Sequence, residues 1–112
     1  MEVFFKTKKL EGDLATDKGR TRAYGAEASK ALAHRMIELA AADSLNVMRT
    51  LPGRCHELHG GRAGQLAVDV RGGLRLIFRP RENPPPAKPD GGLDWTAVTS
   101  IEILEVTDYH GD

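Results

Sequence analysis

Apolar residues recur with two different periods along the chain, and the period changes near Pro52-Gly53. Before that point, the short apolar run of residues 3–6 predicts a first strand. A helical pattern continues to about Tyr24, although Gly12 and Gly19 weaken it. From residue 26 to about residue 42 the helical spacing is clearer, and its apolar positions are Ala28, Leu32, Met36, Leu39 and Ala40. The first half therefore predicts a strand and two helices, the second of them amphipathic, with polar residues such as Arg35 and Glu38 facing away from the core.

Between Pro52-Gly53 and Pro80 apolar and polar residues alternate, which predicts three strands. A three-residue hairpin loop at Arg71-Gly72-Gly73 places the apolar side chains on one face. In this register the core pairs are Val70–Leu74, Val68–Leu76 and Leu66–Phe78. The pairs on the other face are Asp69–Arg75 and Gln65–Arg79. A two-residue loop would mix the two faces, so we reject it.

The last third combines a proline-rich segment with one more strand. Residues 80–93 hold five of the six prolines and have few backbone donors, which predicts an extended surface loop. Residues 98–107 are rich in Ile, Val and Thr, with apolar residues of both parities around Ile103. That pattern predicts a strand that is either covered on both faces or bulged near Ile103.

This order of elements predicts the fold class. It indicates one α+β domain over residues 1–112, with an antiparallel sheet and two N-terminal helices packed on one face. No apolar run approaches the roughly 18 residues of a membrane span, and the start lacks the layout of a signal peptide. The single cysteine, Cys55, has no cysteine partner and suits a reducing compartment. We therefore expect a cytoplasmic protein without a membrane partner.

Charge is unevenly distributed although the formal net charge is zero. Residues 48–81 carry seven arginines against Glu57 and Asp69, whereas residues 82–112 carry Lys88 against seven acids. Such asymmetry is expected when one face meets a polyanion. The alternative, that the basic and acidic blocks pair with each other in the fold, is equally compatible with the sequence.

Histidine and arginine near the predicted open face of the sheet suggest chemistry on RNA. Metal-independent cleavage of RNA needs a base for the ribose 2′-OH, an acid for the leaving 5′ oxygen, and cations for the phosphorane. Histidine suits the acid and base, and the arginine fork matches phosphate oxygens. The candidate substrate-binding residues are Arg54, His59, Arg62, Arg75 and Arg79. The candidate catalytic residues are His56 and the closing Asp108, Tyr109 and His110, in which Asp108 would orient an imidazole and Tyr109 would position a base.

Each candidate has a simpler interpretation. Arg75 is as well placed to pair with Asp69 across the hairpin as to bind substrate, and composition alone favours a frayed tail for the terminal Tyr-His pair. His56 and His59 point to opposite faces of a strand, and the chain offers no third soft ligand. We therefore expect neither a metal site nor a cofactor.

Three segments resemble HigB-type killer proteins of the RelE/ParE superfamily. They are residues 53–65, with the pattern Leu-x-Gly-x-Arg-x-Gly from Leu58, residues 74–78, and residues 105–110 with the Asp-Tyr-His ending. The resemblance implies a RelE-like fold and the toxin of a type II toxin-antitoxin system, which cleaves messenger RNA in the ribosomal A site. It also implies that His56, Asp108, Tyr109 and His110 are active-site residues and that Arg62 and Arg75 face phosphate. The partners it implies are the ribosome, messenger RNA and a small helix-turn-helix antitoxin of the HigA type, while the oligomeric state stays open.

Two other functions fit the same scaffold. A ParE-like inhibitor of DNA gyrase would share the fold but needs no terminal acid-base cluster. A degenerate member that only binds an antitoxin is also compatible, because three positions depart from the pattern of such toxins. His59 stands where lysine is usual, Gly61 where an acid is frequent, and Asp69 where a basic or neutral residue is common.

Overall fold

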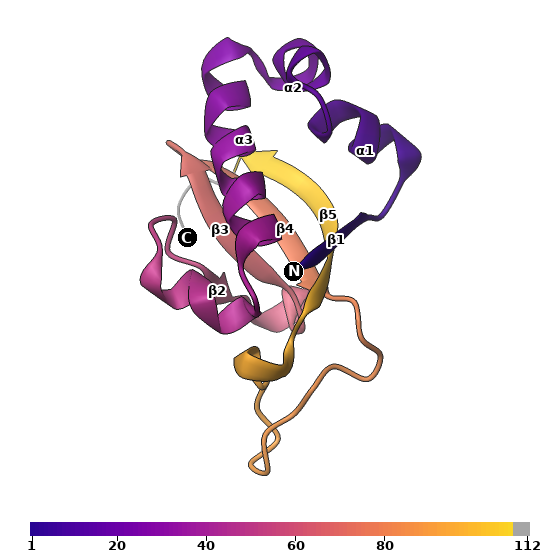
Figure 1. Cartoon of the computed structure of the whole chain (residues 1–112), viewed down its shortest axis with the longest axis vertical. Coiled ribbons are helices and arrows are strands. Elements are labelled where there is room, and N and C mark those ends of the chain that lie inside the picture. The colour runs from indigo at the N-terminus through magenta and orange to yellow at the C-terminus, as the bar shows by residue number, and fades with distance from the viewer. Residues whose placement is uncertain (109–112) are drawn as a thin grey trace.

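The fold begins with a strand and three helices and continues into a hairpin-based sheet (Figure 1). The computed structural model describes residues 1–108. Its strands are β1 (Glu2–Phe5), β2 (His56–Glu57), β3 (Leu66–Arg71), β4 (Leu74–Pro80) and β5 (Ser100–Asp108), and its α-helices are α1 (Lys8–Leu14), α2 (Asp17–Tyr24) and α3 (Ala26–Ala41). Three short 3₁₀ helices are η1 (Leu45–Thr50), η2 (Gly60–Arg62) and η3 (Trp95–Ala97). The α+β class predicted from the sequence is confirmed.

The five strands lie in the order β1-β5-β4-β3-β2. Three neighbouring pairs are antiparallel, as predicted, but β1 runs parallel to β5. The expectation of a purely antiparallel sheet was therefore wrong at this one pair, because the first strand adds to the last one of the chain. None of the helices between residues 1 and 108 combines the length and apolar character needed to cross a membrane.

Helix α3 lies across one face of the sheet and closes the core (Figure 1). Leu32 and Leu39 of α3 are fully buried, together with Leu76 and Phe78 of β4. Arg35, expected to face away, instead lies against the hairpin with only 14% of its side chain exposed, and its Nε donates to the carbonyl oxygen of Asp69 at 2.8 Å. The guanidinium head thus satisfies a backbone acceptor of β3 that the sheet leaves open.

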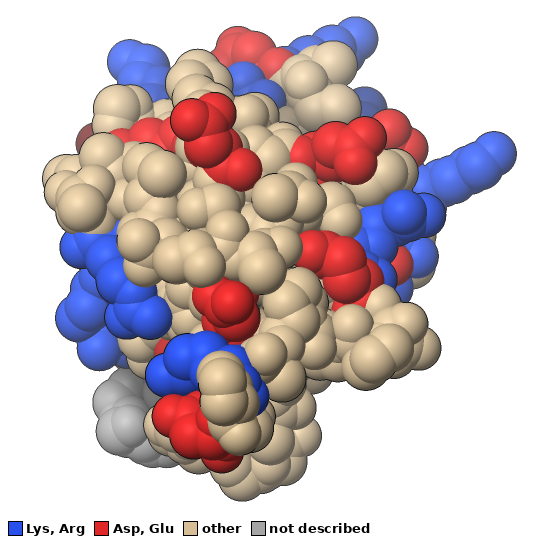
Figure 2. Space-filling view, turned by 60° about the horizontal axis from the view of Figure 1, so that its bottom comes forward, with Lys and Arg blue, Asp and Glu red and all other residues tan. Residues whose placement is uncertain are grey.

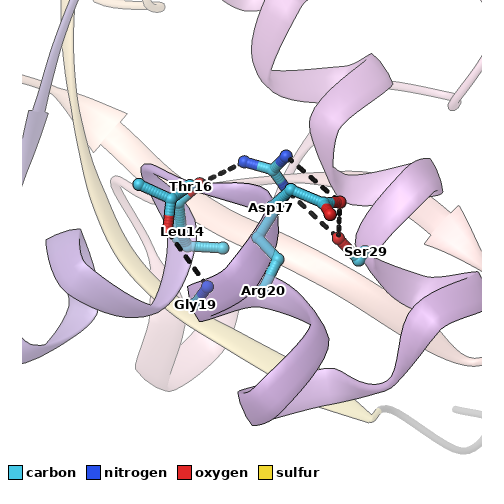
Figure 3. Close-up of polar contacts among 6 residues, drawn as sticks. All are labelled: Leu14, Thr16, Asp17, Gly19, Arg20 and Ser29. Atoms are coloured by element: carbon cyan, nitrogen blue, oxygen red, sulfur yellow. Dashed lines mark hydrogen bonds and ion pairs between the residues drawn. The ribbon is translucent and has the colours of Figure 1, made fainter.

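The segment predicted as one helix up to Tyr24 is two helices. Thr16 begins the second one, since its Oγ1 accepts a hydrogen bond from the backbone N–H of Gly19 at 3.0 Å (Figure 3). Arg20 then donates through Nη1 to the carbonyl oxygen of Leu14, the last residue of α1, at 2.8 Å. The buried hydroxyl of Ser29 on α3 joins the same network by accepting from Arg20 Nε and donating to Asp17 (Figure 3). Three helices therefore replace the two expected ones.

A close approach between α1 and α2 explains one glycine that seemed out of place in a helix. A Cβ atom added at Gly19 would lie 2.2 Å from the carbonyl oxygen of Gly12, whereas one added at Gly12 would meet nothing within 4 Å. Of these two glycines, therefore, Gly19 is the one that the packing requires.

The β3–β4 hairpin has the predicted register except at its tip. Leu66–Phe78, Val68–Leu76 and Asp69–Arg75 are opposed as expected. The register then shifts, and Arg71 rather than Val70 lies opposite Leu74. The loop is consequently the two-residue Gly72-Gly73, with a positive φ of 57° at Gly72, so the predicted three-residue loop and its Val70–Leu74 pair were wrong. Gln65 precedes β3, and the ladder does not extend to the predicted pair with Arg79.

The last strand carries the predicted bulge. Along β4 the partners step from Glu105, opposite Ile77, to Ile103, opposite Phe78, so Leu104 is the extra residue. This bulge explains why apolar residues occur at both odd and even positions of the same strand. The proline-rich segment between β4 and η3 is irregular apart from one bridge between Ala87 and Leu93, as predicted.

Candidate functional site

The sheet face opposite α3 carries the polar residues singled out in the sequence. Successive residues of a strand point to opposite faces, so opposed residues in neighbouring strands share a face. On this side, which we call the open face, one row across the sheet is His56, Ala67, Ile77 and Glu105. The row on one side of it is Asp69, Arg75 and Thr107. The row on its other side is Arg79 and Glu102. The fold thus places His56, Arg75 and Arg79 on one surface.

Asp69 holds two arginines together at the centre of the open face. Its Oδ2 lies 3.1 Å from Nε of Arg54, and its Oδ1 lies 3.1 Å from Nε of Arg75. The Arg75 contact is an ion pair rather than a well-formed hydrogen bond, since within residues 1–108 the buried Oδ1 accepts none. Arg54 reaches this position from a left-handed backbone conformation, with φ of 50°. The predicted pairing of Arg75 with Asp69 is confirmed.

His56 is held in the tautomer that a base requires. Its Nδ1 lies 2.7 Å from the carbonyl oxygen of Arg54. A carbonyl oxygen can only accept, so Nδ1 carries the hydrogen, and the lone pair of the neutral imidazole is on Nε2. Within residues 1–108 no other group hydrogen-bonds this ring. The ring is therefore oriented with an available proton acceptor beside Arg54.

Acids from the last strand neutralise the remaining arginines of the open face. Arg62 Nη1 lies 3.0 Å from Glu105 Oε2, and Arg79 Nη2 lies 2.7 Å from Glu102 Oε1. The basic and acidic blocks of the sequence therefore pair with each other at these two positions. The face seen in Figure 2 carries separate blue and red groups on a largely uncharged background. At Asp69, however, the two arginines Arg54 and Arg75 share a single carboxylate.

The other predicted site residues lie at the margins. His59 is exposed and precedes η2, beyond the end of the two-residue β2, so it is not on the strand where the sequence pattern placed it. Asp108 ends β5 opposite Leu74, and by alternation Thr107, not Asp108, shares the face of Arg75. The predicted catalytic residues Tyr109 and His110 lie outside the described residues.

A residue missed by the sequence reasoning lies beside the open face. Arg81 and Arg79 line a pocket of about 460 Å³ together with Gln65, Glu102 and loop residues around Asn83. The guanidinium carbon of Arg81 lies 3.7 Å from the ring centroid of Phe4. The alternation that marks β4 ends at Pro80, so the sequence pattern assigned Arg81 to the loop. Its neighbour Phe4 comes from β1, whose parallel pairing with β5 the sequence did not signal.

Cys55 is not a nucleophile candidate, although it lies between Arg54 and His56. Burial raises the pKa of its thiol to about 12, outweighing the opposing effect of Arg49, so the thiolate is scarce near neutrality. Within residues 1–108 no group of three His, Cys, Asp or Glu side chains is arranged to hold a metal ion.

Comparison with solved structures identifies the fold. The chain is similar to a YoeB/ParE toxin from Agrobacterium tumefaciens, with a TM-score of 0.56 and 13% sequence identity, over 98% of this chain and 100% of that one. This protein shares the fold of that YoeB/ParE toxin. No protein-family model matches the sequence, and no curated protein matches it.

Proposed function

We propose that this protein is the toxin of a type II toxin-antitoxin system and acts as a metal-independent, ribosome-dependent endonuclease on messenger RNA. The observation that carries the proposal is the orientation of His56 beside the Arg54–Asp69–Arg75 cluster on the open face. The likeness of the fold to a YoeB/ParE toxin supports the broader assignment. A small helix-turn-helix antitoxin of the HigA type is the expected partner.

The proposed reaction begins at His56. Its Nε2 takes the proton of a ribose 2′-OH, and the 2′ oxygen attacks the adjacent phosphorus. The P–O5′ bond breaks, which leaves a 2′,3′-cyclic phosphate on one fragment and a 5′-OH on the other. His110 would protonate the departing 5′ oxygen, Tyr109 would position a base, and Asp108 would orient an imidazole.

Arginine would stabilise the charge that develops on the phosphorane. Arg54 approaches Asp69 through Nε and would offer its terminal nitrogens to phosphate oxygens, while Arg75 would supply positive charge from the other oxygen of Asp69. Phosphate would have to compete with Asp69 for the guanidinium groups, and Arg62, with Glu105, would border the same site. His59 and Arg79 would contact the strand further from the scissile phosphate.

Induction of the protein in cells, followed by primer extension on an abundant transcript, tests the proposal. Wild-type protein should give codon-phased cuts, and His56→Ala should give none. His34→Ala removes an imidazole on α3, 68% exposed and away from the open face, and should cut like the wild type. Intact messages accompanied by DNA damage would instead indicate gyrase inhibition, and the absence of any growth arrest would indicate an antitoxin-binding module.

A further inference from the structure

The pocket beside the open face lies between the edge of the RNA path and the start of the proline-rich loop, which the proposed chemistry leaves unused. Its inner wall is the Arg79–Glu102 ion pair on β4 and β5, and its outer wall comes from the start of the proline-rich loop, Arg81 to Pro85. Residues 63–65, which connect η2 to β3, close a further side. At about 460 Å³, the volume falls in the range of small-ligand sites.

Arg81 differs from the arginines of the open face. Arg54, Arg62, Arg75 and Arg79 each contact a carboxylate, whereas Arg81 has no ion pair within residues 1–108. Its guanidinium instead lies over the ring of Phe4 on β1, which holds the flat group in place. An exposed, oriented guanidinium plane is a surface on which an unstacked base packs.

The polar lining of the pocket selects the kind of ligand. Arg79 and Arg81 are balanced by Glu82 and Glu102, and Gln65 and Asn83 add amide groups. Two carboxylates disfavour a bare phosphate. Glu82 already accepts from the Thr99 backbone N–H and the Ser100 hydroxyl, and Oε1 of Glu102 meets Arg79. Within residues 1–108 this leaves Oε2 of Glu102 to accept a hydrogen bond from a ligand that also offers acceptors to arginine. A nucleobase has this mixed character, and guanine has it most fully, with O6 and N7 as acceptors for arginine and N1–H and the amino group as donors to a carboxylate.

We propose that this pocket, which we call the loop pocket, is a subsite for one unstacked base of single-stranded RNA, with guanine preferred. The inference rests on the proposed function because it extends the same RNA path. Arg79 follows Arg75 by four residues on the same face of β4, a distance of roughly 13 Å along a strand. The base in the loop pocket therefore belongs to a nucleotide beside, and not at, the scissile phosphate.

Binding of uncleavable RNA tests the subsite without depending on catalysis. The probes are fluorescein-labelled 2′-O-methyl hexamers of uridine, with or without one guanosine, because 2′-O-methylation removes the attacking hydroxyl. Fluorescence anisotropy should show that guanosine strengthens binding to the full-length protein about 10-fold, in line with the discrimination that hydrogen bonds to the edge of one guanine provide. Arg81→Ala should remove this preference, and Arg81→Lys should lose it while keeping overall binding.

Arg22→Ala provides the matched control, since it removes an exposed arginine from α2 on another part of the surface. Equal weakening by Arg81→Ala and Arg22→Ala, or an unchanged guanosine preference in Arg81→Ala, would overturn the subsite. So would the absence of any guanosine preference in the wild type. These results are separate from the fate of the nuclease proposal: a protein that cuts messages but shows no preference loses only the subsite, and one that prefers guanosine but never cuts loses only the nuclease.

Discussion

Glu105 on β5 and Arg62 in η2 lie 43 residues apart in the sequence, yet Oε2 of one is 3.0 Å from Nη1 of the other. Both side chains are more than a third exposed, so the pair contributes at most about 1 kcal/mol to stability. Its larger effect is on the open face, because the carboxylate occupies donors that a phosphate would use. Under the proposed function, Glu105 would therefore compete with RNA phosphate for Arg62.

Replacing Glu105 by Gln should strengthen RNA binding with little change in stability. Removing one charge near a phosphate changes the binding free energy by about 1 kcal/mol at low salt, or roughly 5-fold in Kd, and by less as salt rises. Anisotropy titrations at two salt concentrations measure the change. Glu11→Gln removes an exposed acid from α1 and serves as the control; equal effects of the two substitutions would argue against a specific competitor on the open face.

Two glycine-to-alanine substitutions should change stability in opposite directions. At Gly19 the new methyl would press on the backbone oxygen of Gly12, which no side-chain rotation relieves, so α1 and α2 must separate at a cost of roughly 1–3 kcal/mol or more. At Gly12 the methyl enters open space, and helix propensity should add about 0.5–1 kcal/mol. Urea unfolding of both variants tests this, and a stable Gly19→Ala protein would contradict the close approach of the helices.

Arg20 should matter more to folding than its neighbour Arg22. Its side chain is 13% exposed and donates to the carbonyl oxygen of Leu14 and to Ser29, so Arg20→Ala removes buried hydrogen bonds worth about 1–3 kcal/mol. Arg22 is exposed on the same helix, and Arg22→Ala should cost less than about 0.5 kcal/mol. Comparable midpoints of urea unfolding for the two variants would show that the network at the helix junction is dispensable.

The buried thiol of Cys55 should make stability fall in alkali. Its pKa is raised from 9.0 to about 12 by burial, so the folded state keeps the proton while the unfolded state loses it above pH 9. The contribution is therefore fully present below pH 9 and is lost between about pH 9 and 12, by no more than about 1.4 kcal/mol per pH unit. Urea unfolding at pH 8 and pH 10.5 should show a smaller decline for Cys55→Ala than for the wild type, since all other titrating groups are shared. Parallel declines would mean that the thiol is accessible to water.

The sequence predicted those parts of the fold that depend on local periodicity. Alternation placed Val68 opposite Leu76, because any slip by one residue turns every apolar side chain outward. The tip of the hairpin was not predicted correctly. Pairing Val70 with Leu74 fits the alternation as well as the observed pairing does, and a bulge leaves no mark in the pattern of apolar residues. The parallel pairing of β1 with β5 joins segments nearly a hundred residues apart, which periodicity does not connect.

The candidate site was predicted in part for a similar reason. The shared face of Arg75 and Arg79 follows from their spacing on one strand. Their partners do not follow in the same way: Asp69 was visible across a hairpin, whereas Glu102 meets Arg79 only because β5 inserts beside β4. Charge blocks in a sequence indicate that acids and arginines are present, but only the strand order determines which of them meet.

The most direct test of the nuclease proposal is the chemical state of the RNA ends after cleavage. The purified protein acts on a message bound to translating ribosomes, in the presence of a metal chelator that leaves the ribosomes intact. Attack by the 2′ oxygen, with His56 as the base, predicts fragments that end in a 2′,3′-cyclic phosphate and begin with a 5′-OH, and predicts none from His56→Ala. Intact message with the wild-type protein, or fragments that end in a 3′-OH, would contradict the proposal.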